Sequence, residues 1–248
     1  MLSPRIPHRH LELDLLRSLA VAAMIVYHAL YDLWAFYGWD LNPTVGGWRI
    51  FAECIASLFL LLVGASFALS WERASSKEDA TRTRLWKKYL RRGAVVFGCG
   101  MLVTVATYLF DPETYVRFGI LHMIGVSIAL FPFFAGLKEW NALMGGCIVV
   151  IGLWIHGSTA STSLLLPFGI TPTTFDTIDY FPLLPWFGVV LIGYAVGYFM
   201  YIRKKFRSPL PNNPFLKILT WPGRRALIIY LVHQPVLMLF FQILMRHR

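Results

Sequence analysis

Long hydrophobic runs alternate with short polar connections along this chain of 248 residues. Several runs reach the roughly 20 apolar residues that a helix needs to cross a bilayer core, and the short alternating segments of a membrane barrel are not seen. We therefore predict an all-α, polytopic integral membrane protein with about seven transmembrane helices, in a single domain over residues 1–248. The predicted spans are residues 13–36, 50–70, 93–110, 117–136, 141–157, 182–201 and 225–244.

Charged residues are scarce and unevenly placed. They make up 15% of the chain, against 57% hydrophobic residues, whereas a soluble domain has about 25% charged residues. The formal net charge of +10 comes mainly from the second and sixth connections between spans. Cytoplasmic loops carry this excess of Lys and Arg, so we expect a cytoplasmic N-terminus and an external C-terminus. Membrane lipids, and not nucleic acid, are the partners that this placement predicts.

A polar stripe on the first predicted span is the main candidate site. It consists of Asp14, Arg17, His28 and Asp32. At about 100° per residue, Arg17 and His28 lie within roughly 20° of each other around a helix, and Asp32 lies one turn beyond His28. Ionisable groups are costly in lipid unless they face protein or water, which predicts a functional site.

Further polar residues fall on later spans. On the predicted topology His122 lies near the outer end of the fourth span, Asp179 caps the outer end of the sixth, and His233-Gln234 lies near the midplane of the seventh. These groups could converge with His28 and Asp32 on one cavity, with Arg17 towards its cytoplasmic mouth. Alternatively, His122 and His233 each bond to a neighbouring helix.

The second connection, residues 71–92, has two interpretations. Its Lys and Arg residues, Lys88 and Arg92 among them, suit the phosphates of a cytoplasmic donor such as coenzyme A. Alternatively, it is an interfacial helix on anionic lipid.

Other sequence features are less specific. Gly193 and Gly197 have the spacing that lets helices approach closely. The prolines at 182 and 185 suit a helix entry or a broken helix that lines a cavity. The three cysteines are separate and predict buried free thiols, and no metal-binding motif is found.

Several stretches resemble, in order, bacterial proteins related to the heparan-alpha-glucosaminide N-acetyltransferase catalytic domain. Arg17, followed after ten intervening residues by His28, is also similar to an arginine–histidine motif of the wider transmembrane acyltransferase superfamily. The stretches are Leu13–Arg17 with Tyr27-His28 and Asp32-Leu33, then Gly64–Ser70, Phe118–Gly125, Pro182–Gly188 and Tyr230–Pro235.

The resemblance implies a multi-pass enzyme of the bacterial inner (plasma) membrane. Such an enzyme takes an acyl group, typically acetyl, from cytoplasmic acyl-CoA and delivers it to a sugar amine or hydroxyl, or to a lipid-linked saccharide, on the far side. His28 would be the general base and Asp32 its orienting carboxylate, while His122, His233 and Gln234 are candidate donors to the developing oxyanion. Acyl-CoA would contact Arg17, Lys88, Arg92, Arg224 and Arg225, and the acceptor would contact Asp179, Trp186 and Gln234.

The chain also departs from the family pattern. In the lysosomal member of this family, the proposed active histidine lies in the loop after the first family helix, three residues before a tryptophan. Matching that tryptophan to Trp48 places Val45 at the position of the histidine, so this chain lacks it. The alternative hypotheses are a small transporter or flippase, with His28 and Asp32 as a proton or substrate relay, and a non-catalytic scaffold. The sequence leaves a homodimer open.

Overall fold

The computed structural model of the protein describes residues 10–206, 210–211 and 213–245. Within them the chain is helical, and its strand-like pairs are two isolated bridges, so the prediction of an all-α, polytopic membrane protein is confirmed. The elements, in chain order, are α1 (Leu11–Tyr37), α2 (Gly46–Ser75), α3 (Arg82–Phe110), α4 (Ile120–Phe134), η1 (Ala135–Trp140), α5 (Asn141–Trp154), η2 (Ser163–Phe168), α6 (Leu183–Gly197), η3 (Tyr198–Arg203), α7 (Pro214–Leu219), α8 (Trp221–Arg224) and α9 (Ala226–Met245).

The chain folds as two compact units, which are described separately. Unit 1 holds the described residues up to Phe59 together with those after Phe206, and unit 2 is Leu60–Phe206. Helix α2 passes from one unit to the other. A single domain over residues 1–248 stays a prediction.

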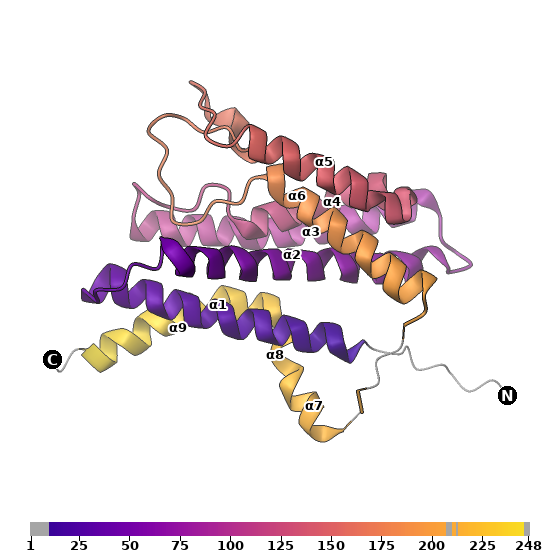
Figure 1. The fold of residues 1–248 in the computed structure, drawn as a ribbon, viewed down its shortest axis with the longest axis horizontal. Coiled ribbons are helices and arrows are strands. Elements are labelled where there is room, and N and C mark those ends of the chain that lie inside the picture. The colour runs from indigo at the N-terminus through magenta and orange to yellow at the C-terminus, as the bar shows by residue number, and fades with distance from the viewer. Residues whose placement is uncertain (1–9, 207–209, 212, 246–248) are drawn as a thin grey trace. The chain divides into compact units, whose positions relative to one another are not determined.

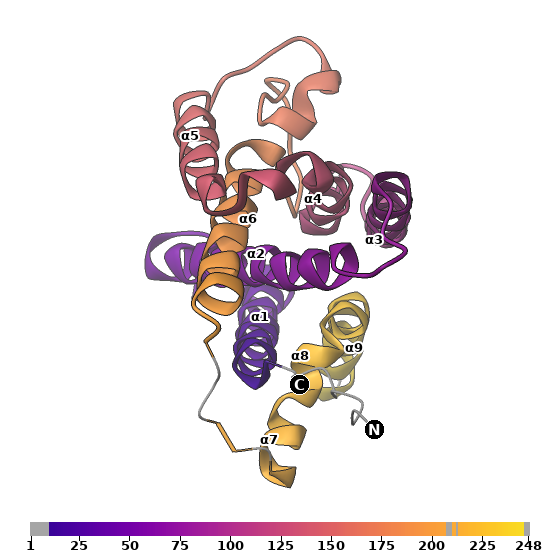
Figure 2. The same cartoon turned by 90° about the vertical axis from the view of Figure 1, so that its right-hand side faces the viewer.

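In unit 1, helix α1 packs against α8 and α9 (Figure 1, Figure 2). Helix α1 ends at Gly38, which has a left-handed φ of 70°. The approach of α8 depends on Gly223, because a Cβ there would lie 2.1 Å from the carbonyl oxygen of Asp14. The Gly223 N–H also donates to Ser18 Oγ at 2.8 Å. These contacts bring the arginine that follows Gly223 to the first turns of α1.

In unit 2, helices α3 and α4 pack as one pair and α5 and α6 as another. The second half of α2 contacts α6 at its glycines. A Cβ on Gly193 would lie 2.2 Å from the carbonyl oxygen of Leu61, and one on Gly197 would lie 2.6 Å from the Cα of Ala65. The predicted close approach at these two glycines is therefore confirmed.

Gly193→Ala tests this packing. We expect a loss of about 1–3 kcal/mol in the free energy of unfolding, because the added methyl must displace backbone and not a flexible side chain. Thermal unfolding of the detergent-solubilised protein measures the loss. The control is Gly146→Ala, since nothing lies within 4 Å of a Cβ at that helical glycine. A control variant as unstable as Gly193→Ala would contradict this explanation.

The turn between α4 and α5 lies where the sequence predicts it. Lys138 leaves the helical region, with φ 49° and ψ −123°. The buried Asn141 side chain donates to the carbonyl oxygens of Phe134 and Lys138, both at 2.9 Å, and so satisfies acceptors that the helix end leaves open.

The count of seven spans stays a prediction, as does the orientation of the termini. Six stretches of the described residues are long and apolar enough to cross a membrane, and one of them, Ile120–Trp154, contains the turn at Lys138. The remaining predicted boundaries agree with the helices to within a few residues, except around the second connection.

The prediction that residues 71–92 lie between two spanning helices is wrong for most of their length. Helix α2 continues to Ser75 and α3 begins at Arg82. The start of α3 is fixed by Thr81, whose side chain accepts from the Arg84 N–H at 3.2 Å. Arg, Lys and Leu are good helix formers, so a capped basic segment extends the span as a helix.

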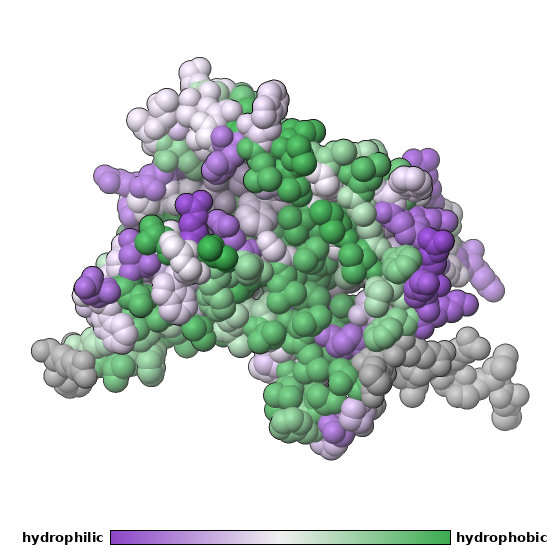
Figure 3. Space-filling view, viewed as in Figure 1, coloured by the Kyte–Doolittle hydropathy of each residue, from purple (hydrophilic) through white to green (hydrophobic). Residues whose placement is uncertain are grey.

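Apolar side chains remain exposed along several helices, as lipid-facing surfaces require. On α5, Val150 is 66% and Trp154 is 83% exposed, and hydrophobic side chains cover much of α5 and α6 in Figure 3. The cysteines are free as predicted, but the expectation that they are buried is wrong. Cys54 and Cys147 are exposed on their helices and Cys99 is partly exposed.

Candidate active site

Two histidines of unit 1 lie against each other, one on α1 and one on α9. The rings of His28 and His233 are 4.7 Å apart, centroid to centroid, and nearly perpendicular at 85°. His28 Nδ1 lies 2.9 Å from the Met24 carbonyl oxygen, and His233 Nδ1 lies 2.6 Å from that of Tyr230. A carbonyl oxygen only accepts, so Nδ1 carries the proton in both rings. Each neutral imidazole therefore keeps its lone pair on Nε2.

A carboxylate and an amide accompany this pair. Gln234 Nε2 donates to Asp32 Oδ1 at 2.6 Å, which joins α9 to α1. Asp32 is fully buried. The expectation that Asp32 orients His28 is not what the hydrogen bonds show, because the Met24 carbonyl holds the His28 ring and the Gln234 amide occupies Asp32.

The chemistry of this group is that of hydrogen-bond acceptors. Three buried side-chain atoms of this group have no hydrogen-bond partner within the described part of the chain: Asp32 Oδ2, His233 Nε2 and Gln234 Oε1. Buried acceptors are costly unless a donor reaches them. The group is therefore suited to a ligand that brings O–H or N–H donors and gives up a proton. We call His28, Asp32, His233 and Gln234 the histidine cluster.

A second polar cluster of unit 1 joins α1 to α8. Asp14 is only 4% exposed, and its carboxylate lies 2.7 Å from Arg17 Nη1 and 3.4 Å from Arg224 Nε. Arg224 also donates to the hydroxyl of Thr220 at 2.7 Å. One carboxylate thus lies between two guanidinium groups. We call Asp14, Arg17 and Arg224 the arginine cluster.

The other predicted donor-binding residues are exposed. Arg225 follows α8 at the surface. Lys88 and Arg92 lie on α3 in unit 2. Lys88 Nζ is 5.2 Å and Arg92 Cζ is 5.8 Å from the ring centroid of the buried Tyr89. Arg92 also donates to Ser70 Oγ at 3.0 Å. Their role towards acyl-CoA or lipid stays a prediction.

In unit 2, His122 has both ring nitrogens engaged. Gly119 N–H donates to Nδ1 at 3.2 Å, which caps the start of α4, and Nε2 lies 3.3 Å from Thr104 Oγ1. The Thr104 hydroxyl itself donates to the Val116 carbonyl at 2.7 Å, so Nε2 carries the proton. A Cβ on Gly100 would lie 3.0 Å from the ring. This geometry favours the interpretation that the His122 side chain hydrogen-bonds to a neighbouring helix.

The carboxylate of Asp179 bonds to the start of α4 and not to the start of α6. The prediction that it caps α6 is wrong, because its Oδ2 accepts from the Ile120 N–H at 3.2 Å while Pro182 precedes α6. The sequence could not show this bond, which joins residues far apart along the chain. The ring of Trp186, the other predicted acceptor-binding residue of unit 2, lies 5.0 Å from that of Phe181. Neither residue's role towards an acceptor is tested by these contacts.

Asp179 also gives a testable pH dependence. Burial raises the pKa of its carboxyl to about 6, while the bond from Ile120 acts in the opposite direction. A carboxyl with a raised pKa binds its proton more tightly in the folded state, so stability rises as pH falls through about 6 towards 4. We expect Asp179→Asn to remove this part of the pH dependence of thermal unfolding. An unchanged pH profile in the variant would contradict the assignment.

Comparison with known proteins agrees with the sequence resemblance. The family model described as heparan-alpha-glucosaminide N-acetyltransferase, catalytic, matches residues 9–235. This range covers both clusters of unit 1 and the whole of unit 2. No curated protein and no solved structure gives a significant match.

Proposed function

Because the chain belongs to the heparan-alpha-glucosaminide N-acetyltransferase catalytic family, it is a multi-pass membrane protein of acetyltransferase type, and we propose a specific reaction for it. Acetyl passes from cytoplasmic acetyl-CoA to an amine or hydroxyl of a saccharide, free or lipid-linked, on the outer side of a bacterial inner membrane. The histidine cluster is the proposed site of transfer.

The observation that carries this proposal is the protonation pattern of the cluster. His28 Nε2 has a lone pair and a ring fixed through Nδ1 by the Met24 carbonyl, as a general base requires. It would take the proton from the acceptor amine or hydroxyl as that atom attacks the thioester carbonyl. The resulting tetrahedral intermediate would collapse by expelling the CoA thiolate, which takes the acceptor's proton from His28 and leaves the imidazole neutral again.

The hydrogen bonds also support a narrower choice of oxyanion donor. Neutral His233 has its proton on Nδ1, engaged by Tyr230, so its Nε2 accepts and does not donate. The Gln234 amide has two N–H groups. One donates to Asp32, and the second can donate to an oxyanion. We therefore assign that role to Gln234 and a second acceptor role to His233.

The arginine cluster suits the phosphate end of the donor. Arg17 and Arg224 together exceed the charge of Asp14, and guanidinium groups bind phosphate well. Arg17 and His28 are about 16 Å apart along the axis of α1. A donor that reaches both must therefore be extended, as acyl-CoA is.

The test uses purified full-length protein in nanodiscs with labelled acetyl-CoA and a panel of amino-sugar and neutral-sugar acceptors. We expect acceptor-dependent release of CoA and acetylation of the acceptor. Absence of acetyl-CoA binding by calorimetry would overturn the proposal. Acceptor flux into proteoliposomes without any acyl donor would instead favour the transporter hypothesis.

A further inference from the structure

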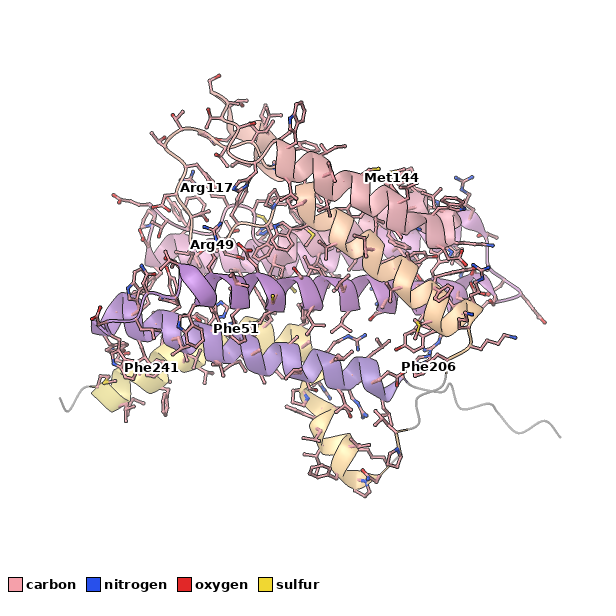
Figure 4. The ribbon with its side chains drawn as sticks, viewed as in Figure 1. Arg49, Phe51, Arg117, Met144, Phe206 and Phe241 are labelled. Carbon is pink, nitrogen blue, oxygen red and sulfur yellow. The ribbon has the colours of Figure 1, made fainter. Side chains whose placement is uncertain are left out.

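Arg117, labelled in Figure 4, lies in the segment between α3 and α4. Its guanidinium lies beside two aromatic rings. Its Cζ is 5.0 Å from the ring centroid of Tyr115 and 5.3 Å from that of Phe175. Its Nε is buried and has no hydrogen-bond acceptor within the part of the chain that the structure describes. A buried N–H group without an acceptor is unfavourable, so this residue requires an explanation.

The two rings are held in place by bonds between segments. Ile178 N–H donates to the Thr114 carbonyl at 2.9 Å, and Thr177 Oγ1 donates to the Tyr115 carbonyl at 2.8 Å. Further along, Phe181 N–H donates to the carbonyl of Phe118 at 2.9 Å. These bonds tie the segment before α4 to the segment before α6 on both sides of Arg117. The guanidinium therefore stacks on a fixed surface.

Two carboxylates of the same segments accept hydrogen bonds from other groups. Asp179 accepts from the Ile120 N–H. The two oxygens of Asp111 accept from Glu113 N–H at 2.9 Å and from the Thr114 hydroxyl at 2.6 Å. Over residues 10–206, 210–211 and 213–245, no ion pair of Arg117 is found. Within these residues, no carboxylate pairs with the guanidinium of Arg117.

We propose that Arg117 is the cation of an oxyanion-binding site formed with Tyr115 and Phe175. A planar guanidinium matches the paired oxygens of carboxylate, sulfate or phosphate, and stacking on aromatic rings fixes its plane. Such an oxyanion has two sources, a soluble ligand and the phosphate of a phospholipid headgroup. The site goes beyond the proposed acetyl transfer and does not depend on it.

The experiment measures thermal unfolding of the full chain with inorganic phosphate at constant ionic strength, in nanodiscs of phosphatidylcholine and, separately, of phosphatidylglycerol. Phosphate also stabilises proteins without binding, so the saturable part of the shift is compared with Arg117→Gln. A saturable shift in phosphatidylcholine that Arg117→Gln lacks identifies a soluble oxyanion. Stabilisation by phosphatidylglycerol alone, again lost in the variant, identifies the lipid headgroup.

Two further variants keep the proposal falsifiable. Arg49→Gln removes an exposed arginine that pairs with Glu53 at 3.0 Å, and we expect it to keep the wild-type shift. Phe175→Leu keeps the cation and removes one ring, so half-saturation should need roughly fivefold more anion. Equal saturable shifts in wild type and Arg117→Gln would overturn the proposal. Should Arg117→Gln not fold, an unchanged half-saturation in Phe175→Leu would overturn it.

Discussion

His28→Asn is expected to lower kcat for acetyl transfer by about 10²- to 10⁴-fold, the contribution of a general base. The asparagine amide can replace the ring N–H that donates to the Met24 carbonyl. The hydrogen bond within α1 is therefore kept while the Nε2 lone pair is lost. Binding of acetyl-CoA should change little, because the proposed phosphate contacts lie in the arginine cluster. The measurement is steady-state CoA release, with donor binding followed by calorimetry.

The matched control is His156→Asn, which changes an exposed histidine beyond the end of α5. It should leave kcat within about twofold, as expected for a surface substitution outside the histidine and arginine clusters. Wild-type kcat in His28→Asn would rule out His28 as the base. Loss of donor binding in the same variant would indicate a structural role for the ring instead.

Much of the helical framework could be predicted, because the length and apolarity of a span are local properties. The stripe on α1 and the turn at Lys138 are local as well. The extension of α3 back to Arg82 does not follow from hydropathy, because the charged residues there interrupt the apolar run. In this segment a threonine cap and good helix formers outweigh the charge, and both are visible in the sequence.

The partners of the site residues were harder to predict. His28 is oriented by a backbone carbonyl, which has no sequence signal, and Asp32 bonds a glutamine about 200 positions away. Distance along the chain predicts a cap on the nearer helix for Asp179, whereas its carboxylate accepts from Ile120 at the start of α4. Polar residues could thus be identified as candidates, but which atoms they leave available depends on tertiary packing.

Asp14→Asn is expected to destabilise the protein by about 3 kcal/mol. Removing one partner of a buried ion pair typically costs about 3–5 kcal/mol, and we take the low end because the side chains of Arg17 and Arg224 are 21% and 26% exposed. The two guanidinium groups would then lose the carboxylate that lies between them. Chemical unfolding in detergent measures the loss.

A double mutant separates this cause from a loss of shape. Removing Arg224 as well, in Asp14→Asn/Arg224→Gln, relieves the repulsion, so its loss should be smaller than the sum of the single losses. Asp79→Asn is the matched control, since that carboxylate pairs with Arg84 at the surface, where the side chains are 60% and 67% exposed. Exposed pairs contribute about 0–1 kcal/mol. Strictly additive losses would show that Asp14 does not act by neutralising the arginines, which would also weaken the case for a phosphate site there.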